Sequence, residues 1–251
     1  MGATFAQGVR VGSRLRMNFS VVSYNIHRCV GSDARKDPDR IADMLRTLSG
    51  DIVGLQEVES HGPPGGNAHQ LDYLARVGGY ESIAGPTMMQ PAGDYGNALL
   101  TSGRVLDVRR HAFPTTRGEP RGLLEASIEI HGRPVRTMVT HLGLHPTERR
   151  KQVAKILAIV GPETEMPIIL LGDFNEWIPW ARSRRQLRER FGRISTPATF
   201  PSKRPMFALD HIWVQPVRVL ESLEAVRTPL SRVASDHLPL RAVVSLESVQ
   251  S

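Results

Sequence analysis

The chain has 251 residues, of which 40% are hydrophobic and 23% charged, so it suits one large α/β domain with a substantial core rather than a disordered protein. No stretch reaches the roughly 18 consecutive apolar residues of a transmembrane helix, and the single cysteine, Cys29, excludes a disulfide framework and a cysteine-rich zinc site. The formal net charge of +7 favours anionic partners, whether phosphate esters, nucleic acid or acidic lipid headgroups.

We expect a single domain over residues 17–251, preceded by a disordered leader over residues 1–16. The leader contains arginines and small residues but no apolar segment of signal-peptide length. Met17 stands directly before the first predicted strand, and the sequence leaves open whether Met1 or Met17 is the natural start. A lone cysteine fits a reducing compartment, so we expect a cytoplasmic protein.

The first elements form a predicted β-α-β unit. Alternating, β-branched residues predict a strand over Phe19–Tyr24 that ends at Asn25. The triplet Asp37-Pro38-Asp39 supplies an N-cap, a proline at the first helical position and an acid in the first turn, and apolar residues follow at helical spacing. A second strand over 51–55 then leads to Glu57. Asn25 and Glu57 are therefore predicted at strand ends on one rim of a sheet.

The middle of the chain is predicted to contain hairpin-like strands and one long helix. In chain order these elements are a surface loop at 60–66, a short helix at 70–76, strands at 97–101, 104–110, 123–130 and 135–140, and a helix at 147–160. The last of these strands ends at His141. Such an order can be accommodated by two mixed sheets packed back to back with helices outside.

The apolar run 167–171 predicts a buried strand that ends in Gly172-Asp173-Phe174-Asn175. It places an acid and an amide two residues apart at a sheet edge, where α/β proteins usually bind their ligands. Alone, the motif could equally be a turn in which the aspartate caps the next helix. Further strands are predicted at 210–214 and 238–246.

The arginine-rich segment 182–190 has two interpretations. It could follow a phosphate backbone of nucleic acid. It could also be the solvated face of a helix, because no aromatic residue is interleaved with the arginines.

Residues suited to metal or phosphate stand at the ends of six predicted segments. They are Asn25, Glu57, His141, Asp173 with Asn175, Asp210, and Asp236 with His237. With the motifs around them, the chain resembles the endonuclease/exonuclease/phosphatase superfamily, which includes DNase I-like nucleases, abasic-site endonucleases, inositol polyphosphate phosphatases and neutral sphingomyelinases. These motifs, in order, are Ser23-Tyr24-Asn25, Leu55-Gln56-Glu57-Val58, Tyr95-Gly96-Asn97-Ala98-Leu99-Leu100, Thr140-His141-Leu142, Gly172-Asp173-Phe174-Asn175, Leu209-Asp210-His211-Ile212 and Ser235-Asp236-His237-Leu238-Pro239.

The resemblance implies an α/β fold, the DNase I-like four-layer α/β sandwich, with two mixed β-sheets packed face to face and helices outside. It also suits the chemistry of phosphate esters. A phosphodiester repels nucleophiles, so a hard cation that neutralises a non-bridging oxygen lowers the barrier to attack. Mg²⁺ takes one or two carboxylates and keeps several waters, and is the expected cofactor, with Mn²⁺ as the alternative.

Metal ligation is predicted for three residues. Glu57 is the principal predicted ligand, and Asn25 lies nearby as an amide that binds phosphate or a metal-bound water. Asp236 is predicted as a second ligand or as a contact on the leaving-group side, and its alternative is to cap the turn before Leu238.

The resemblance assigns catalytic roles to two further pairs. Asp173 would orient or deprotonate the attacking water, and Asn175 would hold water or phosphate. His237 matches the family's terminal histidine, and Asp210 the acid that pairs with it and favours the imidazolium. Whether Asp173 or His237 is the base stays open.

Two more residues complete the predicted phosphate-binding set of Asn25, Asn175, His141, His237 and Arg121. His141 could donate to phosphate or protonate the leaving oxygen, and a histidine here argues against an abasic-site enzyme, which has tyrosine. Arg121 stands in a Gly- and Pro-flanked loop where it could grip phosphate in a bidentate manner, although a plain surface arginine is an equal alternative.

We therefore expect a divalent-metal-dependent phosphoesterase that hydrolyses a phosphodiester by water attack, with DNA or RNA among its candidate substrates. A phosphomonoesterase or a sphingomyelinase-like phospholipid-headgroup hydrolase is the alternative, differing in loops such as 85–94 and 177–190. A non-catalytic nucleic-acid-binding module is a further alternative, but it has no need of the full set of acids, amides and histidines. Binding to anionic lipid is suggested by net charge alone.

Overall fold

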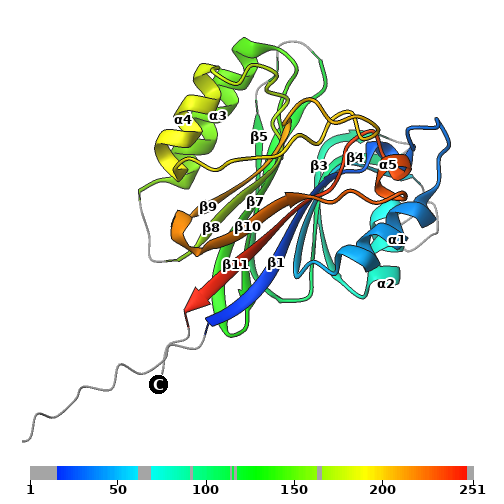
Figure 1. The fold of residues 1–251 in the computed structure, drawn as a ribbon, viewed down its shortest axis with the longest axis horizontal. Helices are drawn as coiled ribbons and strands as arrows, with labels where there is room; N and C mark the ends of the chain where they lie inside the picture. Colours follow the sequence, from blue (N-terminus) through cyan, green and yellow to red (C-terminus); the bar gives the residue numbers. More distant parts are fainter. Residues whose placement is uncertain are drawn as a thin grey trace, which may run out of the picture.

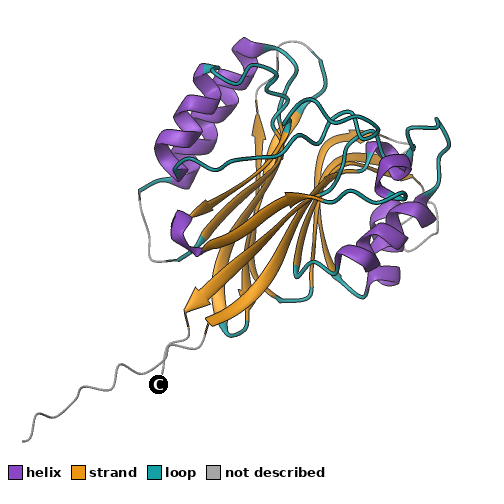
Figure 2. Ribbon diagram, in the orientation of Figure 1, coloured by secondary structure: helices purple, strands orange, loops and turns teal. Residues whose placement is uncertain are grey.

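The computed structural model describes residues 16–61, 69–90, 93–113, 115, 118–162 and 166–247. The predicted leader lies outside these residues, except that Arg16 is the first residue of a strand. Two β-sheets pack face to face between two groups of helices (Figure 1, Figure 2). None of the described helices combines the length and the apolar character needed to span a membrane.

The first sheet has six strands in the order β10-β11-β1-β2-β4-β3. In chain order their bounds are β1 (Arg16–Asn25), β2 (Ile52–His61), β3 (Glu81–Gln90), β4 (Gly93–Thr101), β10 (Leu220–Ala225) and β11 (Leu240–Glu247). β1 and β2 run parallel and the other neighbours run antiparallel. The parallel pair is the product of the predicted β-α-β unit, since the crossover through a helix returns the chain in the same direction.

The second sheet has five strands in the order β5-β6-β7-β8-β9. Their bounds are β5 (Arg104–Phe113), β6 (Arg121–Ile130), β7 (Arg133–His141), β8 (Ile168–Asp173) and β9 (Asp210–Gln215). Here β7 and β8 are the parallel pair, and His141 lies directly opposite Asp173. Each sheet therefore contains one parallel pair.

Three apolar clusters hold the layers together. The central one, between the sheets, draws on both of them, with Val21, Leu99, Val139 and Leu171 fully buried. The outer face of the six-stranded sheet packs under α1 (Pro38–Leu48), α2 (Gln70–Gly78) and α5 (Ser231–Ala234), and that of the five-stranded sheet under α3 (Pro146–Val160) and α4 (Arg182–Phe191). The predicted four-layer sandwich is confirmed.

The start of α1 follows from its capping residues. The carboxylate of Asp37 accepts a hydrogen bond from the backbone N–H of Arg40 at 3.3 Å, and Pro38 occupies the first turn, where a proline costs no hydrogen bond. Short 3-10 turns follow β1, at His27–Cys29, and precede β10, at Val217–Val219.

The structure differs from the sequence prediction at several connections. The predicted variable loop at 85–94 belongs to β3 and β4, which pair with each other, apart from residues 91 and 92, which lie outside the described residues. Likewise Ser60 and His61 end β2, and the rest of the predicted 60–66 loop lies outside the described residues. β10 and α5 were not predicted. Both are short, and β10 is an edge strand with weak apolar alternation.

Candidate active site

The carboxyl ends of the two parallel strand pairs meet at one end of the sandwich. Asn25 ends β1, while His141 and Asp173 end β7 and β8. Loops gather at this end, and the start of β1 and the end of β11 lie at the opposite end (Figure 1). A cavity of about 410 Å³ opens here, with Glu57 and His237 also in its lining.

One carboxylate oxygen is the common neighbour of three distant segments. Oδ2 of Asp173 accepts a hydrogen bond from Asn25 Nδ2 at 3.1 Å and lies 3.5 Å from His141 Nε2 and 3.7 Å from His237 Nε2. Its other oxygen accepts the backbone N–H of Asn175 at 2.9 Å. Residues that stand as far as 148 positions from Asp173 in the chain are thus gathered around it.

The environment makes Asp173 a stronger base than an ordinary aspartate. Burial raises its pKa to about 7, Asp210 adds to the rise, and the positive charge of His237 opposes it. A carboxylate with such a pKa can accept a proton near neutral pH.

His237 is held as an imidazolium by its acidic partners. Its Nδ1 lies 2.8 Å from Oδ2 of Asp210, which also accepts the hydroxyl of Thr199 at 2.5 Å, and all three side chains are buried. Burial lowers the pKa of His237, but the charges of Asp210 and Asp173 outweigh it and raise the pKa to about 10. Because Nδ1 donates to Asp210, Nε2 is the nitrogen that faces Asp173 and the cavity.

The sequence predicted Glu57 at the end of a strand. In the structure Glu57 lies inside β2, which continues to His61. The pairing of β2 with β4 shifts between Leu55 and Val58, and Glu57 adopts a φ of 58° in this bulge. The bulge turns its half-buried carboxylate into the cavity, where Oε1 accepts a hydrogen bond from Asn25 Nδ2 at 3.1 Å. Left-handed backbone at a glutamate is uncommon and marks sites where the surrounding structure imposes it.

The donor set suits a hard divalent cation beside Glu57. Nδ2 of Asn25 donates to the carboxylates of both Glu57 and Asp173, while Oδ1 of Asn25 accepts the backbone N–H of His27 at 3.0 Å. Asp173, Asp210 and His237 also lie within 4.8 Å of one another, but the last two already bind each other. Glu57 is therefore the half-buried carboxylate beside Asn25 that faces the cavity, and an oxygen donor of this kind fits Mg²⁺ or Mn²⁺.

Asp236, a predicted metal ligand, lies beside His27. Its Oδ1 lies 3.7 Å from His27 Nδ1 and accepts a hydrogen bond from the Ser235 hydroxyl at 3.3 Å. It is not among the described residues that line the cavity. Ser235 also donates to the backbone carbonyl of Asn25 at 2.7 Å, so this turn connects the end of β1 to His237.

His141, Asn175 and Arg121 form the wall beside Asp173. Nδ2 of Asn175 lies 3.0 Å from His141 Nε2 and donates to the carbonyl of Leu142 at 3.0 Å. Burial lowers the pKa of His141 well below its usual value, and the charges of Arg121 and His237 lower it further, so the ring is neutral. Arg121 is the first residue of β6 and not part of a loop as predicted, and it is buried against His141 and Glu119, which excludes the alternative of a plain surface arginine.

Gly172 allows β8 to reach this position. Its φ is 143°, and a Cβ at this residue would lie 1.9 Å from the carbonyl oxygen of Thr140 in β7. Only glycine permits such a close approach of the two backbones. The next residues in each strand, His141 and Asp173, are consequently opposite each other.

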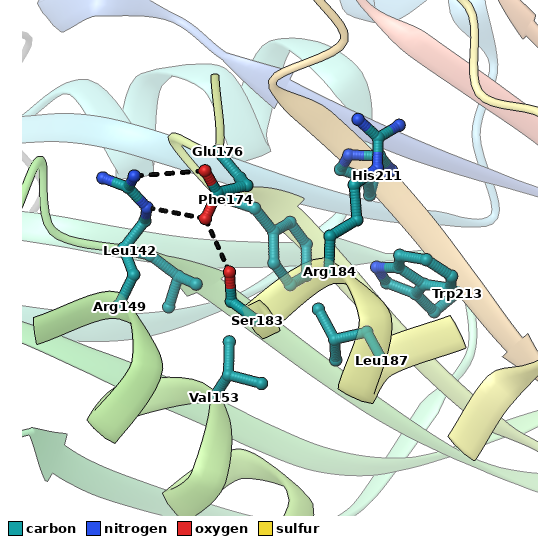
Figure 3. Close-up of a pocket in the computed structure, with 10 residues that line it drawn as sticks. All are labelled: Leu142, Arg149, Val153, Phe174, Glu176, Ser183, Arg184, Leu187, His211 and Trp213. Carbon is teal, nitrogen blue, oxygen red and sulfur yellow. Dashed lines mark hydrogen bonds and ion pairs between the residues drawn. The ribbon is translucent and has the colours of Figure 1, made fainter. Parts of the chain in front are cut away.

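A buried ion pair behind the site was missed by the sequence reasoning. Arg149 of α3 and Glu176, the residue after Asn175, form two contacts of 3.2 Å, and Ser183 of α4 donates to the same carboxylate at 2.6 Å (Figure 3). Arg149 also donates to the carbonyl of Gly143 at 3.2 Å. One guanidinium therefore joins the loop after His141 to the loop after Asp173. Burial of an arginine in the first turn of a helix has no simple sequence signal.

An aromatic wall, also missed, flanks His237. The ring of Phe200 lies 4.9 Å from the His237 ring and 5.6 Å from that of Trp177, and Phe207 lies 4.9 Å from Trp177. Trp177 and Phe200 line the cavity. Their spacing in the sequence shows no periodicity, because they lie on loops that meet only in the folded chain.

The chain is similar in sequence and in fold to several known proteins. The chain is 28% identical over 249 residues to the uncharacterized protein YbhP of Escherichia coli K12, covering 92% of this chain and 98% of that protein. An endonuclease/exonuclease/phosphatase structure from Beutenbergia cavernae matches with a TM-score of 0.73 at 21% identity, covering 92% of this chain and 72% of that one. A mannosyl-6-phosphatase from Bacteroides thetaiotaomicron matches with a TM-score of 0.67 at 19% identity, covering 91% and 99%.

The sequence profile of the Endonuclease/Exonuclease/phosphatase family matches residues 22–237, which includes every strand end that borders the cavity. This match agrees with the two mixed sheets and with the acids, amides and histidines gathered at one end of them. The chain belongs to the Endonuclease/Exonuclease/phosphatase family.

Proposed function

We propose that the protein is a divalent-metal-dependent phosphoesterase that hydrolyses a phosphodiester by direct attack of water. The observation that carries the proposal is the convergence of Asn25, His141 and His237 on Oδ2 of Asp173, at the edge of a cavity that Glu57 also lines. Buried polar groups that serve only the fold are normally paired away from open space. Here they face a cavity large enough for a phosphate group.

The metal would be held by the carboxylate of Glu57, an oxygen donor that suits Mg²⁺ or Mn²⁺, while the Asn25 amide donates a hydrogen bond to that carboxylate. When bound, the cation supplies positive charge against a non-bridging oxygen of the phosphate. Asp236 is a candidate second ligand from the sequence.

Asp173 is the proposed base. Its Oδ2 faces the cavity, and its raised pKa suits it to take the proton of a water molecule that attacks phosphorus. The amide of Asn25 and the backbone N–H of Asn175 fix the orientation of the carboxylate. We assign the base to Asp173 and not to His237, because the Asp210 pair keeps the imidazole protonated.

The two histidines have different proposed roles. His237 carries a positive charge and directs Nε2 into the cavity, so it can donate to a phosphate oxygen and stabilise the charge that develops there. His141 is neutral, and its Nε2 accepts a hydrogen bond from Nδ2 of Asn175, so the two side chains hold each other in place on the wall of the cavity. With His237 they are the proposed phosphate-binding residues of the cavity that Glu57 also lines.

The charge of the cavity favours a diester over a monoester. Arg121 is the one arginine among the described residues of the lining, and it already pairs with Glu119 at 3.0 Å. Carboxylates of Glu57, Glu119, Glu148 and Asp173 border the same space. A singly charged phosphodiester is repelled less by these acids than a doubly charged monoester.

The test compares hydrolysis of bis-p-nitrophenyl phosphate and p-nitrophenyl phosphate with Mg²⁺, Mn²⁺ or a chelator. We expect metal-dependent turnover with a preference for the diester, and a loss of about a thousandfold in kcat in Asp173→Asn. Asp107→Asn is the matched control, because Asp107 is an exposed acid on β5. Wild-type protein that turns over neither compound nor DNA, or full activity in Asp173→Asn, would refute the proposal.

A further inference from the structure

Exposed apolar side chains gather beside the mouth of the cavity. We call this surface the apolar rim, and its members are Leu144, Trp177, Ile178, Trp180, Met206 and Phe207. They come from three loops, which follow β7, follow β8 and precede β9. The exposed fractions of Trp180, Met206 and Leu144 are 83%, 73% and 64%.

The rim is continuous with the cavity. Leu144 and Trp177 line the cavity itself, and Phe207 packs its ring 4.9 Å from that of Trp177. Ile178 belongs to the turn after Trp177, which is closed by a hydrogen bond from the Ala181 N–H to the Ile178 carbonyl at 3.1 Å. Isolated exposed apolar residues are ordinary, but six of them on three loops beside one cavity mark a surface that contacts something apolar.

Positive charge lies next to the rim. A surface hollow between Trp180 and α4 is lined by Arg185, Arg188 and Arg193. α4 carries five arginines and one acid, Glu189, which pairs with Arg185 at 3.6 Å. The segment forms a helix, which is compatible with both interpretations from sequence, and Trp180 stands two residues before the helix begins.

We propose that the apolar rim, with Arg185, Arg188 and Arg193 beside it, docks the protein onto an anionic lipid bilayer, with the cavity mouth facing the headgroups. Tryptophan and aliphatic side chains bury at the boundary of headgroups and acyl chains, and neighbouring arginines attract anionic lipid. A nucleic acid fits the surface less well, because Leu144, Ile178 and Met206 offer no aromatic face for base stacking. The docking itself does not depend on the proposed hydrolase activity.

Co-sedimentation with vesicles tests the docking. The probes are vesicles of equal parts phosphatidylcholine and phosphatidylglycerol, and vesicles of phosphatidylcholine alone, at physiological salt. We expect binding to the anionic vesicles, weakened at least about tenfold in the double variant Trp180→Ala/Met206→Ser. The double variant Arg188→Gln/Arg193→Gln should lose about fivefold for each arginine removed.

Matched controls separate the rim from surface hydrophobicity in general. Leu106→Ser and Val217→Ser remove apolar side chains that are each 44% exposed and lie outside the rim, and vesicle binding should be unchanged. Every variant is also assayed with soluble bis-p-nitrophenyl phosphate, which reports the hydrolase separately and should not respond to Trp180→Ala/Met206→Ser.

The proposal is overturned if wild-type protein does not sediment with the anionic vesicles, or if the rim variant binds them as tightly as wild type. It is also overturned if the protein binds single-stranded DNA but not vesicles, and the same variants weaken that binding. If wild-type protein binds the anionic vesicles but does not hydrolyse the diester, the result counts against the proposed hydrolase function and still supports the docking.

Discussion

Glu57 adopts a backbone conformation that its side chain disfavours. A left-handed φ costs a residue with a Cβ about 1 kcal/mol or more, and the bulge that imposes it also aims the carboxylate into the cavity. Sequence placed Glu57 beside Asn25 but could not reveal the bulge, because a bulge depends on how β2 pairs with β4 in the folded sheet.

Two variants of Glu57 separate strain from function. Glu57→Gly and Glu57→Ala both remove the carboxylate, so both should lose Mn²⁺ binding in isothermal titration. Glu57→Gly should nevertheless be more stable than Glu57→Ala by about 1 kcal/mol in urea unfolding, because glycine adopts a positive φ without steric cost. Equal stability of the two variants would show that the bulge imposes no strain at this residue.

His211 makes the free energy of unfolding depend on pH. It is buried between Phe174 and Trp213, and burial lowers its pKa to about 3, with a further contribution from the charge of Arg184. Below about pH 6.5 the unfolded chain binds a proton at this residue that the folded chain does not, so stability is lost as pH falls from there towards 3 and is unaffected above.

Urea unfolding of His211→Gln at two pH values measures that contribution. Between about pH 7.5 and 5.5, wild type should lose about 1.4 kcal/mol more stability than the variant. Equal losses in the two proteins would mean that His211 is protonated in the folded state as easily as in the unfolded chain.

At the scale of elements, the loops after β7 and β8 are held by one guanidinium. Arg149 reaches from α3 to Glu176 and to the carbonyl of Gly143, and its side chain is only 2% exposed. Removing one partner of a buried ion pair leaves the other charge unsatisfied, at a cost of about 3 kcal/mol or more. Arg149 touches no reacting group and is a positioning residue for His141 and Asn175.

Arg149→Lys and Arg149→Met test this role against Arg150→Met. The neighbouring Arg150 is exposed, so its replacement should change stability by less than about 0.5 kcal/mol. Arg149→Met should unfold at lower urea, and Arg149→Lys, which keeps the charge but not the two-pronged contact, should lower kcat for the diester more than it raises KM. Unchanged kcat in a folded Arg149→Lys would limit this residue to stabilising the fold.

The elements that sequence predicted best are those with strong local signals. α1 has a cap, a proline and apolar spacing, and β8 is a continuous apolar run, so both were placed within a few residues. The aromatic wall and the Arg149 pair arise from loops that meet only through tertiary packing. Local patterns carry no information about such meetings.

At the scale of the whole molecule, the site exists because two sheets each contribute a parallel pair. Asn25 comes from the six-stranded sheet, and His141 with Asp173 from the five-stranded one. The order of motifs along the chain predicted the fold, and it named Asn25, His141, Asp173 and His237, whose side chains the structure brings together. The distribution of charge did not predict the apolar rim, since net charge says nothing about where apolar side chains are exposed.

The most direct test is a crystal structure soaked with Mn²⁺ and a slowly hydrolysed phosphorothioate diester. We expect an anomalous manganese peak against the Glu57 carboxylate, with the phosphorus centre between it and Nε2 of His237, and within one water of Asp173. A manganese peak among Asp173, Asp210 and His237 with none at Glu57, or a diester bound outside this cavity, would contradict it.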